Sequence, residues 1–146
     1  MQGIEIRPIA PDDYAQVAFI ERECFPDPWS EMAVRQTAES EHSVLLVAEV
    51  DGQVIAYGGM LVMFEDAEML NVAVLKKFRG QGIGRAIMQG LISEAITAGA
   101  ERMLLEVRRS NLGAIVLYEK LGFVPISERK GYYADGEDAI IYQINL

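Results

Sequence analysis

The sequence is poor in several reactive residue types: it contains one cysteine, Cys24, one tryptophan, Trp29, and one histidine, His42. A single cysteine excludes an internal disulfide and indicates a reducing compartment. His42 has no second ligand or nucleophile at a useful spacing, so we expect no metal site. No apolar run approaches the roughly 20 residues of a membrane-spanning helix, and the first residues do not resemble a signal peptide. These features predict a soluble, cytoplasmic protein without a membrane segment.

Basic side chains are also scarce, with 13 Lys and Arg against 22 Asp and Glu and a formal net charge of −9. Binding along a nucleic-acid backbone requires clustered Lys and Arg, so this balance argues against a nucleic-acid partner. An acidic surface suits a cationic partner, although it could also serve solubility alone. The 146 residues, 51% of them hydrophobic, predict one domain over residues 1–146 with a substantial core.

Hydrophobic periodicity and turn residues predict alternating strands and helices. The expected strands cover residues 3–9, 44–50, 53–62, 68–74, 103–107, 123–126 and 138–146, and the expected helices cover 11–24, 30–39, 85–98 and about 111–122. The succession of strand 68–74, helix and strand 103–107 predicts a right-handed crossover that makes those two strands parallel. The other neighbouring strands are expected to be antiparallel.

A glycine-rich turn, Arg79 to Gly84, separates strand 68–74 from the following helix. Gly80, Gly82 and Gly84 lie at the helix entrance. The helix presents one apolar stripe at four-residue steps: Ile83, Ile87, Leu91 and Ala95. Glycines there let backbone N–H groups converge on one point, and the first helical turn has unpaired donors and a partial positive charge, which favours an anion site. The alternative is that the glycines serve only tight packing. The dinucleotide fingerprint and the P-loop pattern both fail on this turn.

The turn resembles the acetyl-CoA signature of the GCN5-related N-acetyltransferases (GNAT), in which Arg or Gln precedes x-x-G-x-G/A. Arg79, Gly82 and Gly84 carry this resemblance. It implies a GNAT fold, a mixed and mostly antiparallel sheet with a central parallel βαβ crossover and helices on both faces. It further implies acetyl-CoA as co-substrate, bound by the following residues: Val72, Ala73 and Val74 along the strand edge, and Arg79, Gly80, Gln81, Gly82, Ile83, Gly84 and Arg85 around the pyrophosphate.

Transfer of an acyl group to an amine requires a base for the amine and a proton for the leaving thiolate. Glu106 is a carboxylate in an otherwise apolar strand, which suits a base, but it could instead pair with Arg108 at the strand end. Tyr118 holds its proton at neutral pH and could supply a thiolate, or its ring could simply pack between helix and sheet. Trp29 lies in a Pro-containing loop between two helices, where it could form a wall of the acceptor cleft or fill the core.

A closer resemblance, to the RimI-type ribosomal-protein alanine N-acetyltransferases, covers nearly the whole chain. It rests on five segments: Phe25 to Ser30, Leu105 to Asn111, Ala114 to Phe123, Tyr132-Tyr133 and Glu137 to Ala139. The resemblance implies that Glu106 is the general base, Tyr118 the general acid and Asn111 a cofactor contact.

The same resemblance implies that Trp29, Tyr132 and Tyr133 bind the acceptor, the N-terminal alanine of a small-subunit ribosomal protein. Two alternatives stay open. One is an acetyltransferase for a small amine or a lysine side chain, and the other is an acyl-CoA-binding subunit without turnover. The sequence predicts no oligomeric state.

Overall fold

The computed structural model describes residues 3–146, so Met1 and Gln2 of the expected domain lie outside the described residues. Its elements follow the order β1 (Glu5–Pro8), η1 (Pro11–Asp13), α1 (Tyr14–Cys24), α2 (Glu31–Ala38), β2 (Ser43–Val50), β3 (Gln53–Met63), β4 (Asp66–Val74), η2 (Lys76–Phe78), α3 (Ile83–Thr97), β5 (Arg102–Arg108), α4 (Leu112–Lys120), β6 (Val124–Arg129) and β7 (Ala139–Asn145). No helix within this part of the chain is long and apolar enough to cross a membrane.

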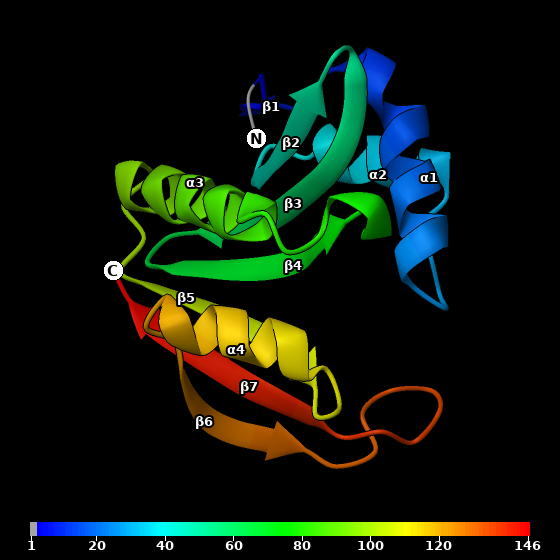
Figure 1. Ribbon diagram of the computed structural model, residues 1–146. Coiled ribbons are helices and arrows are strands. Elements are labelled where there is room, and N and C mark those ends of the chain that lie inside the picture. The colour runs from blue at the N-terminus through cyan, green and yellow to red at the C-terminus, as the bar shows by residue number, and fades with distance from the viewer. Residues whose placement is uncertain (1–2) are drawn as a thin grey trace.

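The strands form one sheet of seven strands in the order β1-β2-β3-β4-β5-β7-β6 (Figure 1). The pair β4–β5 is parallel, and the other neighbouring pairs are antiparallel. The predicted GNAT fold, a mostly antiparallel sheet with a central parallel crossover, is therefore confirmed.

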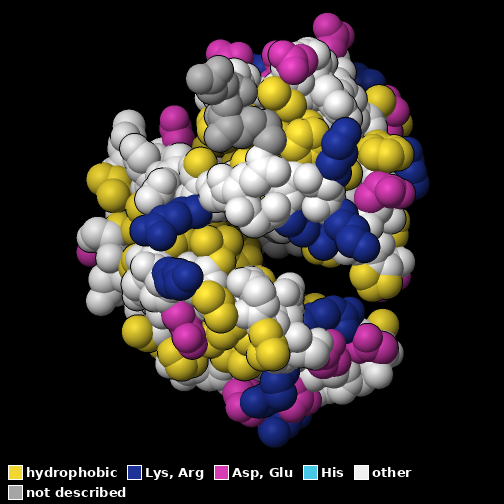
Figure 2. Space-filling view, viewed as in Figure 1, with side chains coloured by type: hydrophobic (Ala, Val, Ile, Leu, Met, Phe, Trp, Pro, Cys, Tyr) yellow, Lys and Arg dark blue, Asp and Glu magenta, His cyan; other side chains and the backbone are white. Residues whose placement is uncertain are grey.

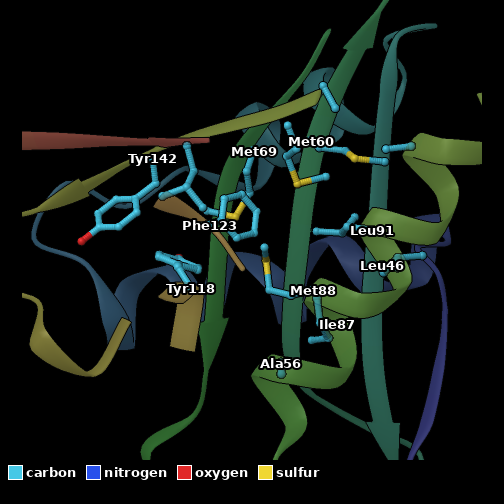
Figure 3. Packing of buried hydrophobic residues seen from close by; sticks show 14 of the residues in the cluster. Leu46, Ala56, Met60, Met69, Ile87, Met88, Leu91, Tyr118, Phe123 and Tyr142 are labelled. Carbon is cyan, nitrogen blue, oxygen red and sulfur yellow. The ribbon is translucent and has the colours of Figure 1, made fainter. Parts of the chain in front are cut away.

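Helices cover both faces of the sheet because the inner strands are apolar on both sides. On β2, the buried residues alternate, so that Leu46 and Ala48 join the core beneath α3 while Val47 joins the core beneath α1 and α2. Figure 3 shows the first core at close range, with Ile87, Met88 and Leu91 of α3 lying against strand residues such as Leu46 and Met60. Helix α4 lies on the same face as α3, so the helix that follows the glycine turn and the helix that carries Tyr118 are neighbours (Figure 1).

Strands β4 and β5 separate soon after their pairing begins. Their ladder joins Asp66–Glu68 to residues 102–104, and further along the chain each strand pairs only with its outer neighbour. A β-bulge accompanies the separation, because Met60 pairs with Met69 while Gly59 pairs with Asn71, which leaves Leu70 as the extra residue of β4. The parallel sheet thus contains an opening at its centre, between the middle of β4 and the end of β5.

Local signals in the sequence determine several element ends. The predicted caps are confirmed, since the backbone N–H of Ala33 donates to Ser30 Oγ over 3.1 Å and that of Ala114 to Asn111 Oδ1 over 3.3 Å. Gly99 and Gly122 end their helices with φ of 92° and 102°.

Other boundaries differ from the expectation. Helix α3 begins at Ile83 rather than at residue 85, and β6 continues to Arg129 rather than ending at residue 126. The first helical segment divides into η1 and α1. The Asp13 carboxylate, which is held by Arg7, accepts a hydrogen bond from Ala10 N over 2.7 Å and fixes the tighter opening turn.

Candidate acetyl-CoA and acceptor site

The glycine turn before α3 has the geometry of an anion-binding loop. Gly80 and Gly82 have φ of 77° and 81°, a region that residues with a Cβ rarely adopt. The first backbone hydrogen bond of the helix runs from Ala86 N to Gly82 O over 3.0 Å. The N–H groups of the preceding helical residues therefore have no acceptor inside the helix and carry its positive dipole end. Side chains are absent at Gly80 and Gly82, so a phosphate group can approach these amides closely.

A cavity of about 710 Å³ runs from this loop between the N-terminal ends of α3 and α4. Its wall includes ten of the predicted cofactor residues: Val72, Ala73, Val74, Arg79, Gly80, Gly82, Ile83, Gly84, Arg85 and Asn111. Gln81 belongs to the same turn but does not line the cavity. Figure 2 shows the molecule hollowed between its two halves, with Lys and Arg side chains at the edge of the hollow. We refer to this space as the cofactor groove.

Arg79 connects the glycine turn to the end of β4 and to α1. Its Nε donates to the carbonyl oxygen of Val74 over 2.9 Å, and its Nη2 lies 3.5 Å from Cys24 Sγ. Cys24, to which the sequence assigned no role, lines the groove beside it. The Arg79 guanidinium therefore braces the loop against the strand that forms the groove's opposite edge.

A second cavity, of about 330 Å³, occupies the opening between β4 and β5. It shares wall residues with the cofactor groove, among them Val72, Asn111 and Tyr118, and it is also lined by Glu106 and Tyr133. A third cavity, of about 480 Å³, continues past Glu106 and both tyrosines, Tyr132 and Tyr133, toward the beginning of β4. We call the second and third cavities together the acceptor cleft.

Tyr118 is placed where the cofactor groove meets the acceptor cleft. Its side chain is buried, and its ring lies 5.9 Å from that of Phe123 at an interplanar angle of 60°. Burial, followed by the nearby Tyr133, raises the pKa of Tyr118 to about 12. The ring therefore packs in the core, as the alternative for this residue expected, and also reaches both spaces as a protonated hydroxyl.

Glu106 faces the acceptor cleft, as its alternation with Val107 in β5 predicts. Its side chain is 29% exposed, and its Oε1 lies 4.0 Å from Nε of Arg129. Arg108, the partner that the alternative expected, instead contacts Asp135 and Glu137 at 2.8 and 3.0 Å, so that pairing is wrong. The Glu106 carboxylate thus remains open to a molecule in the cleft.

Tyr132 and Tyr133 lie in the loop between β6 and β7 and pack edge to face, with ring centroids 5.1 Å apart. The Arg108 guanidinium lies 4.1 Å from the centroid of the Tyr133 ring while holding the carboxylates of Asp135 and Glu137. Glu137 also accepts the backbone N–H of Ser110 over 2.8 Å. These contacts fix the tyrosine pair against the end of β5. Acidic residues after the tyrosines and an arginine after the strand were the signal in the sequence that could have suggested them.

Trp29 lies on the other side of the loop that contains it. Its ring centroid is 6.4 Å from that of Tyr57, and the side chain packs against the core beneath α1 and α2. Trp29 does not belong to the walls of the three cavities described above, whereas Phe25, Pro26 and Asp27 of the same loop line the acceptor cleft. Placement of Trp29 follows the core-filling alternative, and the three preceding residues are the ones that sequence reasoning missed.

The fold and this site define a protein that can hold an anionic, nucleotide-like ligand beside a cleft containing a carboxylate and a tyrosine. The model of the acetyltransferase (GNAT) family matches residues 14–123. The chain is 36% identical over 130 residues to the [ribosomal protein bS18]-alanine N-acetyltransferase of Escherichia coli K12, covering 87% of each chain. The chain belongs to the acetyltransferase (GNAT) family.

Solved structures agree with this membership. The crystal structure of the ribosomal-protein-S18-alanine N-acetyltransferase from Escherichia coli aligns with a TM-score of 0.89 at 34% identity, covering 97% of this chain and 93% of that one. Ard1 from Thermoplasma volcanium aligns with a TM-score of 0.91 at 26% identity, covering 99% of this chain and 98% of that one.

The glycine turn provides a direct test of the cofactor groove. A Cβ at Gly82 would meet no neighbouring atom, so Gly82→Ala acts through the positive φ, which costs an L-residue about 1–2 kcal/mol. We expect the altered loop to weaken acetyl-CoA binding at least about tenfold, measured by titration calorimetry.

Gly99→Ala is the matched control, because Gly99 also has a positive φ and open space but lies at the far end of α3. It should lower the melting temperature similarly and leave acetyl-CoA affinity unchanged. Equal affinities for both variants would remove the loop from cofactor binding.

Proposed function

We propose that this protein transfers the acetyl group of acetyl-CoA to the N-terminal α-amino group of a protein that begins with alanine, a small-subunit ribosomal protein. The observation that carries the proposal is the junction of the cofactor groove with the acceptor cleft at Tyr118, in the opening between β4 and β5. A thioester held in the groove and an amine held in the cleft would meet there. The relatives named for alanine N-acetylation support this choice of acceptor.

On the cofactor side, the amides at the start of α3 and the side chain of Arg85 would hold the diphosphate. The edge of β4 from Val72 to Val74 lines the same groove and has no partner in the β4–β5 ladder, so its backbone groups can pair with an extended arm. Asn111 caps α4 at the opposite wall. Acetyl-CoA supplies the activated acyl group, and these contacts orient it toward the opening.

On the acceptor side, Glu106 would accept the proton of the incoming amine. An α-amino group has a pKa of about 8, so at neutral pH most of it is ammonium and must lose a proton before it can attack. The Glu106 carboxylate is within the cleft and partly exposed, so it can take this proton directly or through water. Phe25, Pro26, Tyr132 and Tyr133 would enclose the first residues of the acceptor.

Tyr118 would donate its proton to the sulfur that leaves. Because its pKa is raised to about 12, the hydroxyl is protonated throughout the neutral range and is available as a donor. A free thiolate has comparable basicity to an ordinary tyrosine, so transfer to sulfur is chemically matched as negative charge develops there.

The acceptor protein is expected to be basic. The net charge of −9 would attract such a partner and disfavour acidic ones. A ribosomal acceptor places the reaction in the cytoplasm.

Peptide acetylation tests the proposed function. We expect thiol release from acetyl-CoA with a peptide that starts with alanine and continues with basic residues. The same peptide with a blocked N-terminus but a free lysine side chain, and polyamines, should give turnover at least about a hundredfold lower, since neither presents an α-amino group. Preferential turnover of lysine or polyamine would contradict the N-terminal acceptor, and absence of turnover with every amine would contradict an enzyme.

Replacement of Tyr118 tests the proton donor. Tyr118→Phe retains the packed ring and removes the proton, so we expect kcat to fall roughly 100-fold or more while acetyl-CoA affinity changes less than about twofold. In the unmodified protein, the donor form is present below the Tyr118 pKa and is lost only as pH rises through about 12. Accordingly, kcat should not decline between about pH 8 and 10.

Tyr142→Phe is the matched control, since Tyr142 is a buried tyrosine of the same core whose hydroxyl donates to Glu119 over 3.0 Å. It should leave kcat nearly unchanged. An equal loss in the two variants would mean that the Tyr118 hydroxyl acts through stability alone.

A further inference from the structure

Glu21 is a carboxylate that the mechanism above does not use, and it is almost fully buried. It lies in α1 with 1% exposure. Three neutral donors converge on its two oxygens: the backbone N–H of Trp29 over 2.8 Å, Asn71 Nδ2 over 3.2 Å, and the Tyr57 hydroxyl. A buried carboxylate is costly unless its hydrogen-bonding capacity is used, and here every contact is a bond to a separate structural element.

The first of these bonds closes the loop that lines the acceptor cleft. The backbone carbonyl of Glu21 accepts the N–H of Phe25 over 2.9 Å, and its carboxylate accepts the N–H of Trp29. One residue therefore binds both ends of the segment from Phe25 to Trp29. Between those two points lie Phe25, Pro26 and Asp27, which form a wall of the cleft.

The remaining bonds reach the opposite wall. Asn71 follows the bulge at Leu70 on β4, and both residues line the acceptor cleft. Tyr57 lies on β3, where burial and then the Glu21 charge raise the pKa of its hydroxyl and keep it protonated as a donor. The carboxylate thus links the loop to the strand across the cleft and determines the distance between them.

We propose that Glu21 is a positioning residue for the acceptor, which holds the 25–29 loop and Asn71 at the separation that the N-terminal residues of the substrate require. This inference rests on the proposed function, because it assigns the cleft to the acceptor. The cofactor groove depends on the glycine turn at the far end of β4 and on α4, so loss of the Glu21 contacts should affect the acceptor and spare acetyl-CoA.

Glu21→Gln is the central variant. Glutamine has the same shape but offers one acceptor oxygen and an NH₂ donor, so at least one of the three donors loses its partner or must reorient. Because hydrogen bonds to a charged group are among the stronger ones, we expect KM for the alanine peptide to rise at least about fivefold, with KM for acetyl-CoA changed less than about twofold. Trp29, the only tryptophan, should become more accessible to acrylamide quenching.

Glu23→Gln is the matched control, since it makes the same chemical change at an exposed position of the same helix. It should leave both KM values and the quenching unchanged. If Glu21→Gln unfolds at the assay temperature, Tyr57→Phe removes one donor and keeps the carboxylate, and it should raise the peptide KM in the same direction by a smaller factor.

Two results would overturn the proposal: an unchanged peptide KM in the folded variants, or a rise of both KM values by the same factor, which would indicate general loosening of the fold. Failure of the proposed function would look different. The unmodified protein would then acetylate no peptide, while the quenching of Trp29 in Glu21→Gln would still report whether Glu21 holds the loop.

Discussion

The structure depends on the early separation of two parallel strands. Strand β4 pairs with β5 over only three residues, and beyond Glu68 its edge toward β5 has no ladder partner. Backbone donors and acceptors that are withdrawn from a ladder need another partner, so this edge is suited to a ligand that can pair with it. The bulge at Leu70 bends β4 away at this point. The cofactor groove, the acceptor cleft and Tyr118 all meet at the opening that results.

The two halves of the opening differ in charge. Arg79 and Arg85 surround the glycine turn, together with the amides at the start of α3, whereas Glu106, Glu68 and Asp66 line the acceptor cleft. A strongly acidic chain can therefore bind an anionic diphosphate, because the positive groups are concentrated where the helix begins. The carboxylates are concentrated where a cationic amine would enter. The Arg108 network keeps the tyrosine pair in position between these regions.

Local signals in the sequence predicted most of the fold. Ser30 and Asn111 as caps, Gly99 and Gly122 as helix ends, and the glycine turn all act within a few residues of themselves, and they occur where expected. Features that depend on distant partners were not predicted. The partners of Arg108 and Glu21, the bulge at Leu70 and the placement of Trp29 require knowledge of which segments come together. Resemblance to a family supplied Glu106 and Tyr118 as candidates, and the structure places both at the opening.

Binding of a single molecule that occupies both spaces tests this account most directly. Coenzyme A joined through an acetyl bridge to the N-terminus of an alanine peptide should bind through the opening, with its nucleotide in the groove and its peptide in the cleft. Because the linkage makes the second contact intramolecular, titration calorimetry should give an affinity at least about a hundredfold higher than that of coenzyme A alone. An affinity equal to that of coenzyme A would contradict the account, since it would mean that the two spaces do not communicate between β4 and β5.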